Sequence, residues 1–198
     1  MDILVFDKWS AKDLAVEDPG LQRYITLDPA YRSKTGARYG GRRFYKSKIF
    51  IVERLINKLM VPGHRGKKHK ITSGHVTGKA ANARRIVEEA FELVEKRTKK
   101  NPVEVFVKAL ENGAPREEIL TIEYGGARYP KAVDVAPQRR VDYVLRLLVH
   151  GSFDRSFNKK KSMAQALADE IVAAYSMSAD STAISKKNDV ERQADSSR

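Results

Sequence analysis

The sequence predicts a mainly α-helical fold, a bundle of about six helices with a two-stranded β-hairpin that protrudes between the third and fourth helices. Three observations predict it. Apolar residues recur at helical spacing in several segments after residue 46. Some of these segments begin or end with residues that cap helices. One stretch, at about 119–135, is instead rich in β-forming residues and is interrupted by adjacent glycines.

The first two helices are predicted from their apolar faces. The first is expected from about Ser47, a residue suited to N-capping, to the Pro62-Gly63 pair, with apolar residues at positions 49, 52, 55, 56, 59 and 60. The second is expected from about Lys79 to Lys99, with its apolar face at positions 83, 86, 87, 90, 91 and 94. Between them, the segment from Pro62 to Gly78 is rich in His, Gly and Lys, which predicts a polar, mobile loop.

The third helix has the clearest end signals in the chain. Asn101 is expected to cap it, Pro102 to occupy its first position and Glu104 to close a capping box. The Asn112-Gly113 pair, followed by Pro115, is expected to end it.

The hairpin and three more helices complete the predicted fold. Residues 119–124 and 129–135 are expected to be the strands, with the tip near Gly125 to Arg128. Two strands alone are marginally stable in water, so this ribbon must pack on helices or on a partner. The fourth helix is expected from Pro137 and the fifth from Ser162, where Gln165 completes a capping box. A short sixth helix is expected after Ser181, where apolar residues are few.

Positive charge is concentrated in two segments. The net charge is +13 and the isoelectric point about 9.9. Residues 31–70 hold thirteen Lys and Arg against one acidic residue, residues 136–161 hold seven against two, and residues 71–135 hold eleven against ten. Such a balance favours a polyanionic partner, whether nucleic acid, an anionic membrane surface or an acidic protein. No stretch is long and apolar enough to span a membrane, and the N-terminus lacks the pattern of a signal peptide.

The chain is expected to divide at about residue 45. Residues 1–45 mix Gly, Pro, Tyr and Arg without a sustained period, which predicts an extended basic N-terminal arm that is disordered until it meets a partner. Residues 46–198 are expected to form the helical domain, with its hairpin at about 119–135.

Cations lie where helix geometry disfavours them. Near a helix N-terminus each cation opposes the macrodipole by about 0.3–1 kcal/mol. Three predicted helices nevertheless start with them, at Lys46 and Lys48, at Lys79, Arg84 and Arg85, and at Arg139 and Arg140. Bound phosphate groups would explain this, because free amide donors, the dipole and the cations would all favour one anion. An exposed, solvated basic face is the alternative.

Aromatic residues are interleaved with this charge, namely Tyr31, Tyr39, Phe44, Tyr45, Tyr124, Tyr129, Phe153 and Phe157. Such rings can stack on unpaired bases while Lys and Arg hold phosphates. Packing in the core is the alternative, and it is at least as well supported for Phe44 and Phe153. Tyr129 beside Arg128 at a turn favours exposure.

The sequence predicts no catalysis, no cofactor and no metal site. Cysteine is absent, which excludes disulfides and thiolate chemistry. Residues 74–79 fall one residue short of a phosphate-binding loop, and Ala80 stands where its hydroxyl belongs. The histidines at 64, 69 and 75 lack the spacing of a recognised metal site. The glutamates at 88, 89, 92 and 95 are typical of a solvated helix face.

Four stretches resemble, in their order along the chain, the family of small-subunit ribosomal protein seven in its archaeal or eukaryotic form. They are INKLM at 56–60, KAANARRIV at 79–87, ALENGAP at 109–115 and GGARY at 125–129. The resemblance covers about residues 46–198.

The resemblance implies a structural component of the small ribosomal subunit in the cytoplasm. Such a protein binds the 3′ major domain of the small-subunit rRNA, initiates assembly of the subunit head, borders the exit-site tRNA and the mRNA exit path, and adjoins proteins of the head and platform. The residues expected to hold rRNA are Arg42, Arg43, Lys46, Lys48, Lys67, Lys68, Lys79, Arg84, Arg85, Arg139 and Arg140. Those expected near tRNA and mRNA are Gly125, Gly126, Arg128 and Tyr129.

Two other functions remain open on the sequence. A translational regulator that binds mRNA would use the same charge. An RNA-modifying enzyme would need a nucleophile, a metal set or a cofactor loop, and the sequence offers none that we recognise.

Overall fold

The computed structural model describes residues 3–30, 34–36, 39–65, 68–69 and 76–198. Its elements are, in order, η1 (Tyr45–Lys48), α1 (Ile51–Leu59), β1 (His64–Arg65), β2 (Lys68–His69), α2 (Ala80–Thr98), α3 (Pro102–Gly113), β3 (Glu117–Tyr124), β4 (Ala127–Asp134), α4 (Pro137–Ser156), α5 (Met163–Tyr175) and α6 (Thr182–Asp195). The predicted fold is confirmed: the chain is mainly helical, and one antiparallel hairpin lies between α3 and α4.

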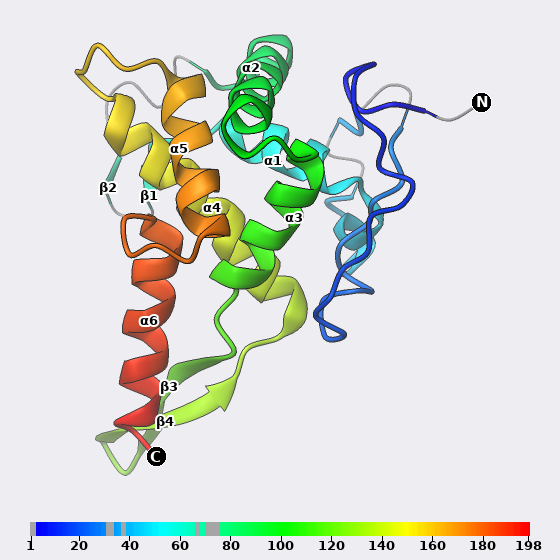
Figure 1. Cartoon of the computed structure of the whole chain (residues 1–198). Coiled ribbons are helices and arrows are strands. Elements are labelled where there is room, and N and C mark those ends of the chain that lie inside the picture. The colour runs from blue at the N-terminus through cyan, green and yellow to red at the C-terminus, as the bar shows by residue number, and fades with distance from the viewer. Residues whose placement is uncertain (1–2, 31–33, 37–38, 66–67, 70–75) are drawn as a thin grey trace.

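Helix α5 is at the centre of the bundle and packs against α2, α3 and α4 (Figure 1). Its sequence is apolar enough for this place, since five alanines, Leu167, Ile171 and Val172 leave little polar surface. Helix α1 lies across α2 and α4. The largest fully buried apolar side chains are Phe91, Phe106, Leu21, Ile51, Leu55, Leu59, Leu110, Leu148, Leu167 and Ile171. They belong to a single core.

Local capping signals explain where three helices begin. The predicted box at α5 is present, since Gln165 N donates to Ser162 Oγ (3.2 Å) and Ser162 N donates to Gln165 Oε1 (3.4 Å). At α3, Asn101 accepts from Val103 N (3.0 Å), so the cap is confirmed but the box through Glu104 is not. Helix α6 has 14 residues and is longer than predicted, because Ser181 caps it.

The start of the first helix was predicted wrongly. Ser47 lies in η1, and α1 begins at Ile51 with no side-chain cap. The reason is a tertiary contact: Thr26 Oγ1 donates to Ser47 O (2.6 Å), and Ile51 N donates to Thr26 O (3.0 Å). The loop that follows α1 also differs from the prediction, because β1 and β2 form a short antiparallel ladder within it.

The β3–β4 hairpin turns through two glycines. Gly125 has φ +58° and Gly126 has φ +80°, the left-handed values that a two-residue turn between antiparallel strands requires. The register pairs Tyr124 with Ala127 and Glu117 with Asp134, so the ladder starts two residues earlier than predicted. Helix α6 packs along the hairpin and supplies the support that two strands need (Figure 1).

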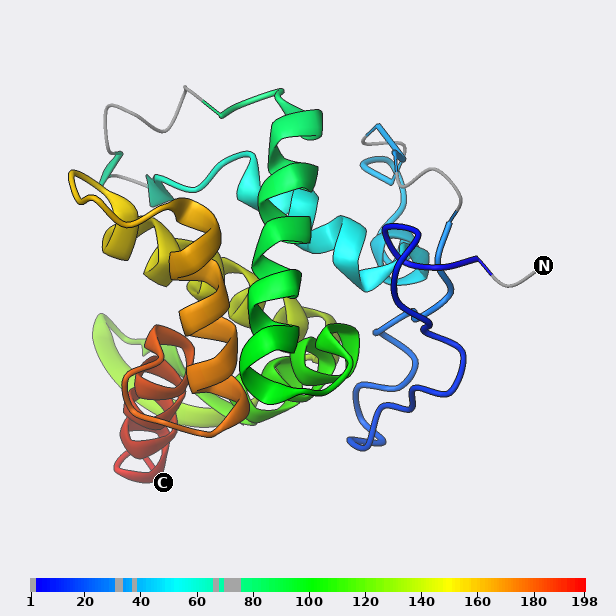
Figure 2. The ribbon, with the colours of Figure 1, turned by 45° about the horizontal axis from the view of Figure 1, so that its top comes forward.

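The N-terminal segment follows an irregular path on the side of the bundle formed by α1 and α3 (Figures 1 and 2). Its backbone is extended and turned, as the sequence indicates. Its apolar residues Val5, Trp9, Ala11, Val16, Leu21 and Ile25 are nevertheless buried in the same core as the helices. The division of the chain at residue 45 stays a prediction, but the segment is anchored on the bundle. Within the described ranges, no helix is both long and apolar enough to cross a membrane.

Candidate nucleic-acid interface

Two of the three helices predicted to begin with cations, α2 and α4, do so and lack a side-chain cap; α1 also lacks one, but Lys46 and Lys48 lie before it in η1 and Ile51 N donates to Thr26 O. At α1, α2 and α4 the N-cap residues are Phe50, Lys79 and Ala136, and none makes a side-chain cap hydrogen bond. The first turns of α2 and α4 also lack an acidic residue. Their free amide groups therefore remain available to an outside anion.

The start of α2 presents three cations to solvent. Lys79, Arg84 and Arg85 are all exposed. Arg85 lies 3.2 Å from Asn82 Oδ1 and 3.7 Å from Glu89 Oε1, which are weak contacts at a surface. The Arg84 guanidinium lies 5.5 Å from the centre of the Phe6 ring, which orients it without neutralising it. This cluster keeps its charge available.

The segment before α1 pairs arginines with exposed rings. Arg42 lies 5.8 Å from the Tyr45 ring centre, and Arg43 lies 5.2 Å from that of Phe44. Phe44 is 55% exposed, so core packing is ruled out for it, whereas Phe153 is buried and packs with Phe157. Cation–aromatic pairs on a surface are suited to stacking with unpaired bases.

Lys48 is exposed, whereas Lys46 is half-buried and pairs with Asp142 of α4. Of the cations predicted in the loop after α1, Lys67 lies outside the described residues. Lys68 lies in β2, and its side chain also lies outside the described part.

The two arginines at the start of α4 have different environments. Arg139 is 61% exposed and donates twice to Glu118 Oε2, from Nε (3.0 Å) and Nη2 (2.8 Å). Arg140 is buried, and it donates from Nε to Pro115 O (3.0 Å) and from Nη2 to Asp18 Oδ2 (2.8 Å). Both arginines are predicted from the sequence to contact RNA, but in the structure the guanidinium of Arg140 is hydrogen-bonded to groups inside the protein.

This internal contact changes the acidity of its carboxylate. Burial by itself would raise the pKa of Asp18. The hydrogen bonds from Arg140 and from Gly20 N, with the charge of Arg140, outweigh burial and hold the pKa of Asp18 below its ordinary value. Asp18 is therefore ionised and bound to Arg140 at neutral pH.

The hairpin tip is exposed on both strands. Tyr124 is 81% exposed and Tyr129 is 58% exposed, and among the residues that the structure describes the ion-pair partner of Arg128 is Glu123, at 3.5 Å. The exposure favoured for Tyr129 is thus confirmed. A two-residue turn that carries rings and a cation into solvent can reach a partner beyond the bundle.

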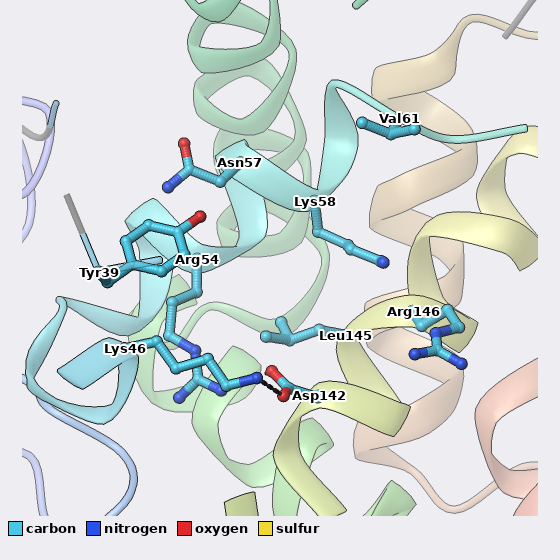
Figure 3. Close-up of a pocket in the computed structure, with 9 residues that line it drawn as sticks. All are labelled: Tyr39, Lys46, Arg54, Asn57, Lys58, Val61, Asp142, Leu145 and Arg146. Atoms are coloured by element: carbon cyan, nitrogen blue, oxygen red, sulfur yellow. Dashed lines mark hydrogen bonds and ion pairs between the residues drawn. The ribbon is translucent and has the colours of Figure 1, made fainter. Parts of the chain in front are cut away.

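A pocket between α1 and α4 brings Tyr39 and Lys46, which the sequence analysis names, together with functional candidates that it missed. Tyr39, Lys46, Arg54, Asn57, Lys58, Val61, Asp142, Leu145 and Arg146 line it, and its volume is about 310 Å³ (Figure 3). Four of these side chains are cations and one is a carboxylate. Figure 3 shows Lys58 extending from α1 towards Arg146 on α4, with Tyr39 and Asn57 on the other side.

A periodic signal for this pocket exists in the sequence. Arg54 and Lys58 are four residues apart on α1, and Asp142 and Arg146 are four apart on α4, so each pair shares a helix face. What the sequence does not give is that these two faces meet.

Within the described residues, no group of three or more His, Asp or Glu side chains is placed to hold a metal ion. The glutamates of α2 that might suggest an acidic site bind a lysine instead, since Lys8 Nζ lies 2.7 Å from Glu88 Oε1 and 2.5 Å from Glu92 Oε1.

The chain is similar to archaeal ribosomal proteins along its whole length. It is 54% identical over 198 residues to small ribosomal subunit protein uS7 of Nanoarchaeum equitans, which covers 100% of both chains. It is 46% identical over 197 residues to uS7 of Archaeoglobus fulgidus, which covers 100% of this chain and 96% of the relative. It is 44% identical over 194 residues to uS7 of Methanothrix thermoacetophila, which covers 98% and 99%. Residues 18–198 match the family described as ribosomal protein S7p/S5e. The uncapped cationic helix starts thus occur in a sequence whose resemblance to ribosomal protein seven is confirmed, and the chain belongs to the ribosomal protein S7p/S5e family.

Proposed function

We propose that this chain is a structural, non-catalytic component of the small ribosomal subunit that binds the 3′ major domain of the small-subunit rRNA and initiates assembly of the head. The observation that carries the proposal is the coincidence of family membership with two helix starts, those of α2 and α4, that have no side-chain cap, no acidic residue in the first turn and exposed cations beside them. In the proposed complex, Lys48, Lys79 and the arginines near them neutralise phosphates and set the orientation of the bundle on the RNA.

The β3–β4 hairpin has a second role in this proposal. Its tip at Gly125, Gly126, Arg128 and Tyr129 borders the exit-site tRNA and the path of departing mRNA. The bundle adjoins proteins of the head and platform, within ribosomes of the cytoplasm. The support is the exposure of the tip and its reach beyond the bundle.

Removal of one cation in η1 and one at the uncapped start of α2 tests the rRNA contact. Lys48 and Lys79 are exposed, and neither has an ion-pair partner in the described part of the chain, so Lys48→Ala/Lys79→Ala should leave the fold intact. We expect weaker binding to the isolated 3′ major domain, and a plot of log K against log salt that is shallower by about 0.7–0.9 for each phosphate that the variant no longer neutralises. Filter binding at several salt concentrations measures both.

The matched control removes two exposed cations from segments of balanced charge, as Lys96→Ala/Arg192→Ala. This control should keep the slope of the unmodified protein. An unchanged slope in the Lys48→Ala/Lys79→Ala protein would contradict the assignment of these two cations to rRNA.

The hairpin tip is tested by Arg128→Ala. The side chain is 74% exposed, and its ion pair with Glu123 is a weak surface contact at 3.5 Å, so its removal should leave stability nearly unchanged. We expect subunits reconstituted with this variant to assemble normally but to release exit-site tRNA about threefold to tenfold faster, as one charge-assisted contact is removed. Release of labelled tRNA from purified subunits measures this. Failure of assembly would instead make the tip an rRNA contact.

A further inference from the structure

The pocket between α1 and α4 carries positive charge that the protein does not compensate. Lys46, Arg54, Lys58 and Arg146 face one carboxylate, Asp142. That carboxylate is already shared, because Lys46 pairs with one of its oxygens and Arg54 Nη2 donates to the other at 2.9 Å. Arg54 is itself buried and also donates to Tyr24 O (2.9 Å), which fixes the floor of the pocket.

The charges of Lys58 and Arg146 are not neutralised by an ion pair within the described residues. Neither has a hydrogen-bond or ion-pair partner among the residues that the structure describes, and Lys58 is half-buried. Burial lowers the pKa of Lys58, the charges of Arg146 and Lys46 lower it further, and Asp142 opposes them only in part. An anion placed between Lys58 and Arg146 would relieve this repulsion, so the charges of the pocket favour anion binding.

The walls of the pocket suit more than a bare anion. Its volume of about 310 Å³ lies at the lower end of the range for small-molecule sites, about 300–1,000 Å³. The Tyr39 ring offers a stacking surface, the Asn57 amide offers a donor and an acceptor, and Val61 and Leu145 are apolar (Figure 3). A phosphate group alone would leave these side chains without a contact.

We propose that this pocket binds one unpaired nucleotide of RNA, with its phosphate between Lys58 and Arg146 and its base against Tyr39. The inference rests on the proposed RNA-binding function and adds the kind of RNA that this site selects. A base held in a duplex is stacked on both sides and cannot reach the ring, whereas a nucleotide from a loop or bulge can. The site therefore fixes the protein at an irregular point of its RNA, while the helix starts bind phosphates without regard to sequence.

The test compares two changes that act on different parts of the nucleotide. Lys58→Met/Arg146→Met removes the charges but keeps the aliphatic stems, and Tyr39→Leu removes the stacking surface while keeping an apolar side chain. Affinity is measured for a short single-stranded RNA oligomer, for an RNA duplex of equal length and for the 3′ major domain. Circular dichroism and thermal unfolding establish that each full-length variant is folded, and Lys96→Ala/Arg192→Ala serves as the matched control.

We expect each pocket variant to bind the single-stranded oligomer about tenfold more weakly, and the duplex no more than about twofold more weakly. Adenosine monophosphate should compete with the oligomer better than inorganic phosphate does. Equal reductions for duplex and single strand, with no effect of Tyr39→Leu, would reduce the pocket to a phosphate contact and overturn the proposal.

The failure of this inference and that of the proposed function give different results. If the unmodified protein binds the 3′ major domain and the pocket variants bind the oligomer as well as it does, the pocket proposal alone is wrong. If the unmodified protein does not bind the 3′ major domain at all, the proposed function fails as well.

Discussion

Replacing Trp9 with alanine is expected to lower the free energy of unfolding by about 3–5 kcal/mol, the usual cost of deleting a buried aromatic side chain. Trp9 is only 6% exposed. Its ring lies 6.2 Å from that of Phe6 and 6.0 Å from that of Phe91, both at steep angles, and Phe91 in turn contacts Phe106 at 5.7 Å. This cluster joins the N-terminal segment to α2 and α3, so its removal releases the segment and opens the core.

Urea denaturation followed by far-UV circular dichroism measures this effect. Tryptophan fluorescence cannot be used for the variant, because Trp9 is the only tryptophan of the chain. Trp9→Phe is the conservative control and should be destabilised much less. Lys8→Ala, which removes the surface pair with Glu88 and Glu92, should also have a small effect, because exposed ion pairs contribute little. A destabilisation below about 1 kcal/mol for Trp9→Ala would mean that the segment is a separable arm.

The N-terminal segment shows where sequence reasoning stops. Its buried residues, Val5, Trp9, Ala11, Val16, Leu21 and Ile25, follow no helical or strand period. In a single sequence, a buried face is recognised by the regular spacing of its apolar residues. An irregular segment that packs on distant helices has no such spacing, so its sequence resembles that of a disordered arm. A contact of the same segment explains why the start of the first helix was predicted wrongly. Thr26 hydrogen-bonds to Ser47 O before the start of α1 and to Ile51 N at its start.

Elements governed by local chemistry were predicted well. The Ser162 and Gln165 box and the Asn101 cap are formed by residues two or three positions apart, and the Gly125-Gly126 turn needs only the φ values that glycine permits. The candidate site was predicted in part. Exposed cations at helix starts could be found from spacing, but the pocket required knowing that α1 and α4 meet.

Arg139 and Arg140 are adjacent and chemically alike, so the sequence could not distinguish them. Their exposure separates them, because the side chain of Arg139 is 61% exposed and that of Arg140 only 10%. In the folded protein, Arg140 joins the N-terminal segment at Asp18 to the chain just before β3 at Pro115, and so it holds the base of the hairpin on the bundle. A residue so placed supports the proposed RNA-binding surface from inside the protein.

Arg140→Ala is therefore expected to lower the free energy of unfolding by about 3 kcal/mol at neutral pH, since it leaves a partly buried carboxylate without its partner. Arg139→Ala, whose pair with Glu118 lies at the surface, should cost about 1 kcal/mol at most. In RNA binding the order reverses: Arg139→Ala should flatten the salt dependence, and folded Arg140→Ala protein should keep the slope of the unmodified chain.

The pH dependence of the Arg140→Ala defect identifies its origin. Because the pKa of Asp18 is held below its ordinary value, the stabilisation from this carboxylate is present above that value, near 4, and is lost as pH falls through the lower pKa of the folded protein. In Arg140→Ala protein, only the hydrogen bond from Gly20 N and the charge of Arg116 still oppose the effect of burial on the pKa of Asp18, so less stabilisation remains to disappear on acidification. The difference in unfolding free energy between the two proteins should thus be largest at neutral pH and shrink below about pH 4. Urea titrations at neutral and acidic pH measure it, with Asp18→Asn as a variant that should remove the pH-dependent part alone. A difference that does not change with pH would mean that Arg140 stabilises the fold through Pro115 and not through Asp18.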